Sequence, residues 1–335
     1  MLQFFGFKKK RENQAPVQTT PTALAVSTNC QPVSSNAIKL RHNSQLPLFI
    51  GSPSSSDISV PDEKERLLKI IAQSEFADLP ATVFDQSWLA QIPADWIIPP
   101  LEPFFEYLPV EEQHVEMLRE LRWLLAVKCI ETYDRRLSSY QLLNFLATEI
   151  IRHHDGICLD GSSGRTYTRS DIDTMLLRDS ASAGTFTESP TPSLRPFLSV
   201  TATRYGERVW MTGHGLARFD LPELEIDCVE PDLAEPTVYL LNGLAQALIE
   251  RVIDVREAGE SAISLDELFA VSTDAIVNGN RGDMPFSACV PRTESIKLKL
   301  VHRESGRRLN PDYHSPSETN AVLRRMLTNL SLLPG

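Results

Sequence analysis

The stretch that most constrains the fold runs from Val209 to Asp227 and reads VWMTGHGLARFDLPELEID. An alternating run with a tryptophan comes first, a glycine-histidine-glycine turn follows, and a second alternating run, with acidic residues, closes the stretch. Alternation of apolar and polar residues indicates strands with one buried face. This part of the chain is therefore expected to form antiparallel β-structure around tight turns, with one hairpin turning at Tyr205-Gly206.

Five other segments repeat apolar residues at helical spacing, which predicts helices. They cover residues 62–74, 110–135, 138–154, 236–257 and 319–330. The second and third are joined by a short connection, so we expect them to form an antiparallel helical hairpin. Helices interspersed with strands that are mostly joined as hairpins predict an α+β fold, with a mostly antiparallel sheet packed against four or five helices.

The N-terminal region has a different composition. Residues 13 to about 60 are rich in Ser, Thr, Pro, Gln and Asn, and they carry too few apolar side chains to offset the entropy of ordering. We expect a disordered basic tail over residues 1–60 and an acidic body over 61–335, which could divide into subdomains 61–180 and 195–335. The apolar island Leu46–Ile50 is either a sticky patch in this linker or a segment that docks on the body or on a partner.

Charge is unevenly distributed along the chain. The net charge is -11, but residues 1–61 hold six Lys or Arg against two acids, so the tail carries +4 and the rest -15. An acidic body repels phosphate backbones, which argues against direct nucleic-acid binding. Phe4, Phe5 and Phe7 beside Lys8–Arg11 indicate either a solvated terminus or weak contact of residues 4–11 with an anionic membrane surface.

The spacing of the cysteines and the length of the apolar runs indicate the cellular compartment of the protein. The five cysteines are scattered without a CxxC pair, which argues against a disulfide framework or a zinc cluster. No run approaches the roughly 18 apolar residues of a membrane span. The chain starts with apolar residues followed by charges, the reverse of a secretory signal. A cytoplasmic protein is expected.

Two histidines end the segment 138–154. His153 and His154 are adjacent, and neighbouring helical residues point about 100° apart, so joint ligation of one ion is disfavoured. Histidine at a helix C-terminus complements the helix dipole. The sequence predicts neither a metal site nor a cofactor.

The turn around His214 is either a tight turn that merely tolerates the histidine or, in the alternative interpretation, the candidate site. Gly213 and Gly215 allow positive φ, and they would display His214 at a strand end. Glu223 and Glu225 follow on the next strand, where they are expected to form a solvated carboxylate row with Asp227. The row of carboxylates is also a candidate docking surface for the basic segment Lys8–Arg11.

The segment from Thr212 to Glu225, TGHGLARFDLPELE, resembles a bacterial domain family of unknown function that carries a T-x-G-L-x-x-F-x-L-P-E-L-E type segment after a hairpin. This chain departs from the pattern in reading Thr-Gly-His-Gly-Leu at its start. The resemblance covers residues 110–260 and implies a bacterial α+β domain without an assigned activity.

No cofactor loop, ligand spacing or nucleophile motif such as GxSxG is present in the sequence. The sequence therefore favours a non-enzymatic interaction or accessory protein of the bacterial cytosol that binds a protein partner. The alternative is an enzyme with its site at residues 212–215 around His214.

Overall fold

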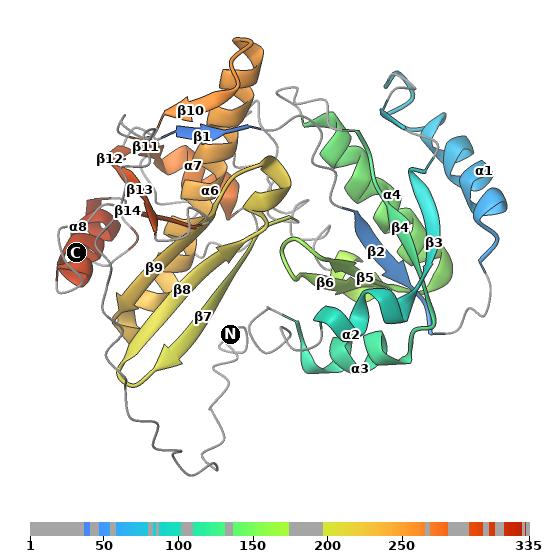
Figure 1. Cartoon of the computed structure of the whole chain (residues 1–335), viewed down its shortest axis with the longest axis horizontal. Coiled ribbons are helices and arrows are strands. Elements are labelled where there is room, and N and C mark those ends of the chain that lie inside the picture. Colours follow the sequence, from blue (N-terminus) through green and yellow to red (C-terminus); the bar gives the residue numbers. More distant parts are fainter. Residues whose placement is uncertain are drawn as a thin grey trace, which may run out of the picture.

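The chain folds into two α+β lobes that lie side by side (Figure 1). In the described part of the chain, no helix is long and apolar enough to cross a membrane. The computed structural model describes residues 37–40, 47–53, 58–79, 83–84, 87–101, 110–130, 137–173, 197–264, 269–280, 295–303, 308–311, 318–329 and 332.

The first lobe is built on an antiparallel sheet with the strand order β3-β4-β2-β5-β6. Its two faces are covered by different helices, and consecutive residues of β4 and β5 therefore belong to different apolar clusters. Leu124 and Ile157 pack in the cluster that includes the 98–118 helices, whereas Leu125 and Cys158 pack in the larger core. The strands are β2 (Leu48–Gly51), β3 (Leu89–Pro93), β4 (Trp123–Val127), β5 (Ile157–Asp160) and β6 (Thr166–Thr168), and the helices are α1 (Val60–Ile71), α2 (Ile98–Leu101), α3 (Glu112–Glu120) and α4 (Ser138–His154), with a 3-10 turn η2 (Ala94–Trp96).

The second lobe is built on a five-stranded sheet with the order β13-β14-β9-β8-β7. The pair β14–β9 is parallel and the other pairs are antiparallel. Helix α6 packs along β7, β8 and β9 and covers one face of this sheet (Figure 1). The strands are β7 (Ser199–Tyr205), β8 (Arg208–His214), β9 (Glu223–Val229), β13 (Leu300–Arg303) and β14 (Arg308–Pro311), and the helices are α6 (Ala234–Glu257), α7 (Thr273–Gly279) and α8 (Thr319–Asn329), with 3-10 turns η5 (Leu216–Phe219) and η6 (Pro231–Leu233).

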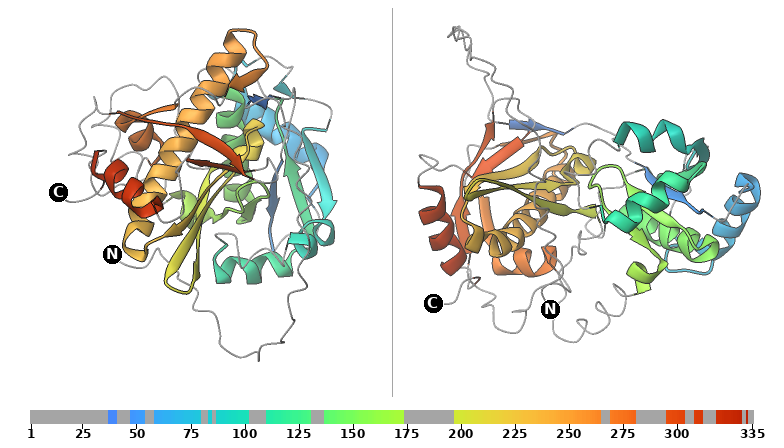
Figure 2. Two further views of the ribbon diagram at one scale, coloured as in Figure 1. Left: turned by 60° about the vertical axis from the view of Figure 1, so that its left-hand side comes forward. Right: turned by 90° about the horizontal axis from the view of Figure 1, so that it is seen from below.

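Two short strand pairs complete the second lobe, and the first of them joins distant parts of the chain (Figure 2). Strand β1 (Ala37–Lys39) pairs with β10 (Ala262–Ser264), and β11 (Phe269–Ser272) pairs with β12 (Ser295–Leu298). Pairing of β1 with β10 ties the start of the described chain to the lobe that residues 197–332 build.

The two lobes meet through η5. Arg218 of η5 forms a buried ion pair with Asp160 at the end of β5, with Nη2 2.6 Å from Oδ1. Phe219 stacks on Tyr140 of α4 at 4.6 Å between ring centroids. Ser199 Oγ at the start of β7 donates to the Ser163 carbonyl at 2.6 Å. Apolar packing and buried polar contacts therefore join the lobes at this junction.

The α+β prediction is confirmed, and four expected helices are present as α1, α4, α6 and α8. The expected helix over 110–135 is wrong. Among the described residues 110–130, only α3 is helical, and the chain then enters strand β4, whose residues 124, 125 and 127 are buried. A strand covered on both faces carries an unbroken apolar run, which mimics part of a helical pattern. The expected helical hairpin with α4 does not form.

The boundary of the tail at residue 60 also needs correction. Strand β1 lies at 37–39, and the island at 46–50 contributes β2, which sits between β4 and β5 in the middle of a sheet. Leu48 and Ile50 are buried in the core. Of the two interpretations of the island, docking on the body is the one realised. Residues 1–36, including the proposed membrane-contact segment 4–11, lie outside the described residues.

Candidate functional site

The sheet face opposite α6 carries the residues around His214. Alternate residues of β8 point to opposite sides: Val209 and Met211 are buried, whereas Trp210 is 37 % exposed. Residues directly opposite each other on neighbouring strands lie on the same face of the sheet. Thr203 is opposite Trp210, and Thr201 is opposite Thr212, so all four lie on one face. We call this the outer face, and its members are Thr201, Thr203, Tyr205, Trp210, Thr212, His214, Glu225 and Arg308.

His214 lies at the end of β8 and contacts the neighbouring strand. Its Nε2 atom is 2.9 Å from Thr201 Oγ1 on β7. Burial, together with the nearby positive charge of Arg308, lowers the pKa of His214 to about 4. The imidazole is therefore neutral at neutral pH, and it forms a hydrogen bond with the Thr201 hydroxyl.

The two glycines that flank His214 have different roles. Gly215 has φ +109°, and a Cβ there would stand 2.0 Å from the Phe197 carbonyl oxygen. Gly213 has no positive φ, and its Cβ would meet Leu224 at an ordinary 3.6 Å. The conformational freedom inferred from the sequence is required at Gly215 alone.

Glu223 holds the turn that follows His214. Its Oε1 atom accepts hydrogen bonds from the amides of Gly215 and Ala217, both at 3.1 Å, and Oε2 accepts one from Leu216 at 3.2 Å. Burial raises the pKa of Glu223 to about 7, against the opposing effect of the three amides. Its carboxylate thus caps the start of η5 and fixes the position of Arg218 at the lobe junction.

Glu225 is also engaged within the body. Its side chain is only 4 % exposed and forms an ion pair with Arg308 of β14. The Arg308 guanidinium in turn lies over the Trp210 ring, 5.1 Å from the centroid. The expected solvated row of Glu223, Glu225 and Asp227 is therefore wrong, because the first two carboxylates are used by the turn and by β14.

Strand β7 forms one edge of this sheet. Its only partner among the described strands is β8, so its other side is not paired within the described chain. Tyr205, at the end of β7, is 47 % exposed, and the exposed Trp210 lies opposite Thr203. An edge strand with exposed aromatic residues beside it can accept an added strand.

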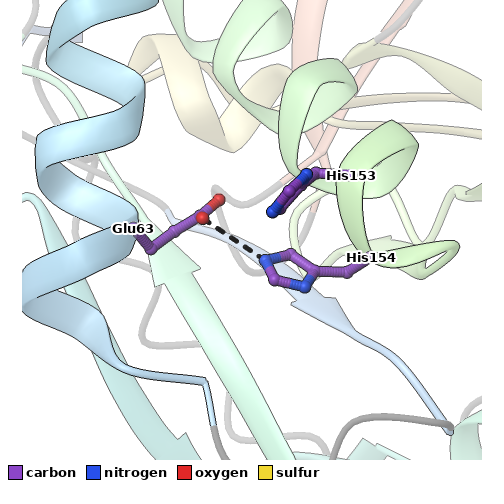
Figure 3. Close-up of side chains that lie close together, drawn as sticks. All are labelled: Glu63, His153 and His154. Carbon is purple, nitrogen blue, oxygen red and sulfur yellow. Dashed lines mark ion pairs between the residues drawn. The ribbon is translucent and has the colours of Figure 1, made fainter.

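A second cluster lies in the other lobe and joins α1 to the end of α4 (Figure 3). One ligand atom each from Glu63, His153 and His154 lies within 4.8 Å of the other two. Glu63 also pairs with Arg66, and its Oε2 is 3.4 Å from His154 Nε2. Burial acts to raise the pKa of Glu63, but Arg66 and His154 lower it to about 2. Sequence spacing could not indicate this cluster, because Glu63 comes from 90 residues earlier.

Comparison of the chain with protein-family models, with curated proteins and with solved structures gave no match. The resemblance of residues 212–225 to a bacterial domain family therefore stays a prediction.

Proposed function

We propose that the chain is a non-enzymatic protein that binds a partner protein by accepting an extended segment along the edge of β7. The observation that carries the proposal is the unpaired side of β7 among the described strands, with Tyr205 and Trp210 exposed beside it. Backbone hydrogen bonds to an edge strand supply affinity, and side chains on the sheet face supply selectivity.

The outer face is suited to such a segment. The Arg308 guanidinium stacks on the Trp210 ring, and β8 fixes the Trp210 backbone, so this aromatic side chain is already ordered before a partner arrives. Exposed aromatic residues with few rotatable bonds are common centres of protein interfaces. We expect the bound segment to place apolar side chains at alternate positions, over Trp210 and near Tyr205.

The alternative of an enzyme centred on His214 has weaker support. The hydrogen bond between His214 and Thr201 brings an imidazole to a hydroxyl, as in nucleophile-base pairs. A lowered pKa, however, makes the imidazole a poor proton acceptor at neutral pH. Glu223, which could have served as its partner, already binds the amides of the turn.

Site-specific photocrosslinking in the native cell tests the proposal. A photoreactive amino acid at Thr203 of β7 should give a discrete adduct with a partner protein. The same amino acid at Lys69, which is exposed on α1 in the other lobe, serves as the matched control. We expect the Thr203 adduct to be lost in Trp210→Ala, whose fold is checked by circular dichroism.

Two results would contradict strand addition at β7. One is equal labelling from Thr203 and Lys69, which would indicate random collision. The other is a Thr203 adduct that persists unchanged in Trp210→Ala, which would place the partner away from the outer face.

A further inference from the structure

We propose that Glu63, His153 and His154 bind a divalent transition-metal ion of the zinc class, which links α1 to the C-terminal end of α4. This site is in the first lobe, and it is independent of the strand-addition surface on β7. The three side chains offer one carboxylate oxygen and two imidazole nitrogens, a ligand set that Zn²⁺ takes up in proteins.

The geometry is close to that of a three-ligand site. Zn²⁺ bonds nitrogen and oxygen at about 2.0–2.2 Å, so the ligand atoms around one ion lie about 3–4 Å apart. The three ligand atoms are within 4.8 Å of one another, and the pair from Glu63 and His154 is already at 3.4 Å. Small rotations of the imidazole rings close the remaining gap. The Glu63 carboxylate and both rings converge on one volume (Figure 3).

His154 supplies a second observation. Its Nε2 atom is buried and faces Glu63 Oε2 at 3.4 Å, an ion pair that lacks the geometry of a good hydrogen bond (Figure 3). The contact is longer than a normal N–H···O hydrogen bond, so this buried nitrogen is poorly satisfied, and a metal ion bound to it would satisfy it better. The backbone that follows the His154 ring is fixed, because Ser52 Oγ donates to the His154 carbonyl at 2.8 Å and the chain reverses at Asp155 with φ +50°.

His153 and His154 reach the same volume although they are consecutive. They occupy the last turn of α4, and their ring centroids are 4.7 Å apart in an edge-to-face arrangement. Adjacent helical residues leave the helix about 100° apart, but the imidazole rings beyond the Cβ atoms can rotate toward the same volume. Glu63 lies on a separate helix beside that turn, so both imidazoles can bend toward it.

Arg66 is the main competitor for the carboxylate. Its Nε donates to Glu63 Oε2 at 2.9 Å and its Nη2 donates to Oε1 at 2.7 Å. An ion at Oε2 would replace the first contact and leave the second, so Arg66 would then orient the carboxylate from behind. Three protein ligands leave one coordination position for water.

Cobalt(II) is the probe, because its visible spectrum reports the ligands and the geometry. The full chain should bind one Co²⁺ that Zn²⁺ displaces, with a spectrum free of thiolate charge-transfer bands, since the proposed set contains no cysteine. His153→Ala should weaken Co²⁺ binding by at least about tenfold, because loss of a group that only orients a ligand already costs about that much and His153 is a ligand itself. Because His153 is exposed, this variant should keep its fold. Zn²⁺ should also raise the melting temperature of the wild type and not that of His153→Ala.

Two substitutions away from the proposed site serve as controls, one on the same helix as Glu63 and one at a histidine in the other lobe. Glu63→Gln should lose binding, whereas Glu65→Gln, which alters an exposed carboxylate on α1, should bind as the wild type does. His302→Ala changes a histidine of β13 in the other lobe and should have no effect. The proposal is overturned if the full chain shows no saturable Co²⁺ binding, or if His153→Ala binds Co²⁺ as tightly as the wild type.

Discussion

Arg218 and Asp160 are charged residues that are almost completely buried, at 1 % and 0 % exposure. Asp160 is further bound by the Ser162 amide and the Ser163 hydroxyl, both at 2.9 Å. Removing one member of a buried ion pair leaves an uncompensated charge and typically costs about 3–5 kcal/mol. We expect Arg218→Met to lower the free energy of unfolding by about that amount in urea denaturation.

An exposed arginine gives the control for this prediction. Arg324 on α8 pairs with Glu230 and Asp232, but its side chain is 48 % exposed. Exposed pairs contribute little because water screens them. Arg324→Met should therefore leave the unfolding transition nearly unchanged. Equal effects of the two substitutions would mean that Arg218 is not held in a buried pair.

His214 and Glu223 give opposite pH dependences of stability. The pKa of His214 is lowered from 6.5 to about 4, so the unfolded chain binds the extra proton and stability rises with pH through this window. The pKa of Glu223 is raised from 4.5 to about 7, so the folded chain binds the extra proton and stability falls as pH rises. Each effect amounts to at most about 3 kcal/mol, because one pKa unit corresponds to about 1.4 kcal/mol.

The two contributions should largely cancel in the wild type between pH 4.5 and 6.5. Urea denaturation at both pH values is the measurement. Relative to the wild type, His214→Gln should become less stable as pH rises, and Glu223→Gln should become more stable. The same pH dependence in all three proteins would show that neither group has a shifted pKa.

Gly215 and Gly206 form a matched pair for a backbone test. Both have positive φ, but a Cβ at Gly215 would collide with the Phe197 carbonyl, whereas at Gly206 nothing lies within 4 Å. Gly206→Ala should cost about 1 kcal/mol, the penalty of a left-handed conformation. Gly215→Ala should cost clearly more, because backbone must move at the lobe junction. Thermal melts of the two variants that coincide would contradict this.

At the scale of elements, the sequence predicts the helices with clear amphipathic periodicity and the strands with clear alternation. Helix α4 begins and ends where its pattern does, and β8 and β9 flank the expected turn. Strands β2 and β4 are not predicted from the sequence, because each packs against an apolar cluster on both faces. A short apolar run of that kind has no period to detect, and its partners are distant in the sequence.

Strand β2 should therefore be essential to the first lobe. It lies between β4 and β5, so its removal would leave two unpaired edges and expose the side of the core that Leu48 and Ile50 fill. Deletion of residues 1–53 should abolish cooperative thermal unfolding of this lobe. Deletion of residues 1–36, which ends just before β1, is the control and should retain it. A folded chain starting at Ser59 would contradict the observed sheet order.

At the scale of the whole molecule, the sequence indicates the residue types of the candidate sites but not their neighbours. His214 and Glu223 were recognisable from one short stretch, yet the hydrogen bond to Thr201 and the ion pair between Glu225 and Arg308 depend on strand order. Glu63 meets His153 and His154 only because α1 packs beside α4. Contacts between elements distant in sequence cannot be derived from local periodicity, which reports only on faces and spacing.

Amide hydrogen exchange along β7, measured with and without the crosslinked partner, is a direct test of strand addition at this edge. Strand addition forms backbone hydrogen bonds at every second residue of an edge strand, and such bonds slow exchange. We predict protection of alternate amides between Ser199 and Tyr205 when the partner is bound, with no change in α1 of the other lobe. Binding that leaves the exchange of β7 amides unchanged would contradict the account.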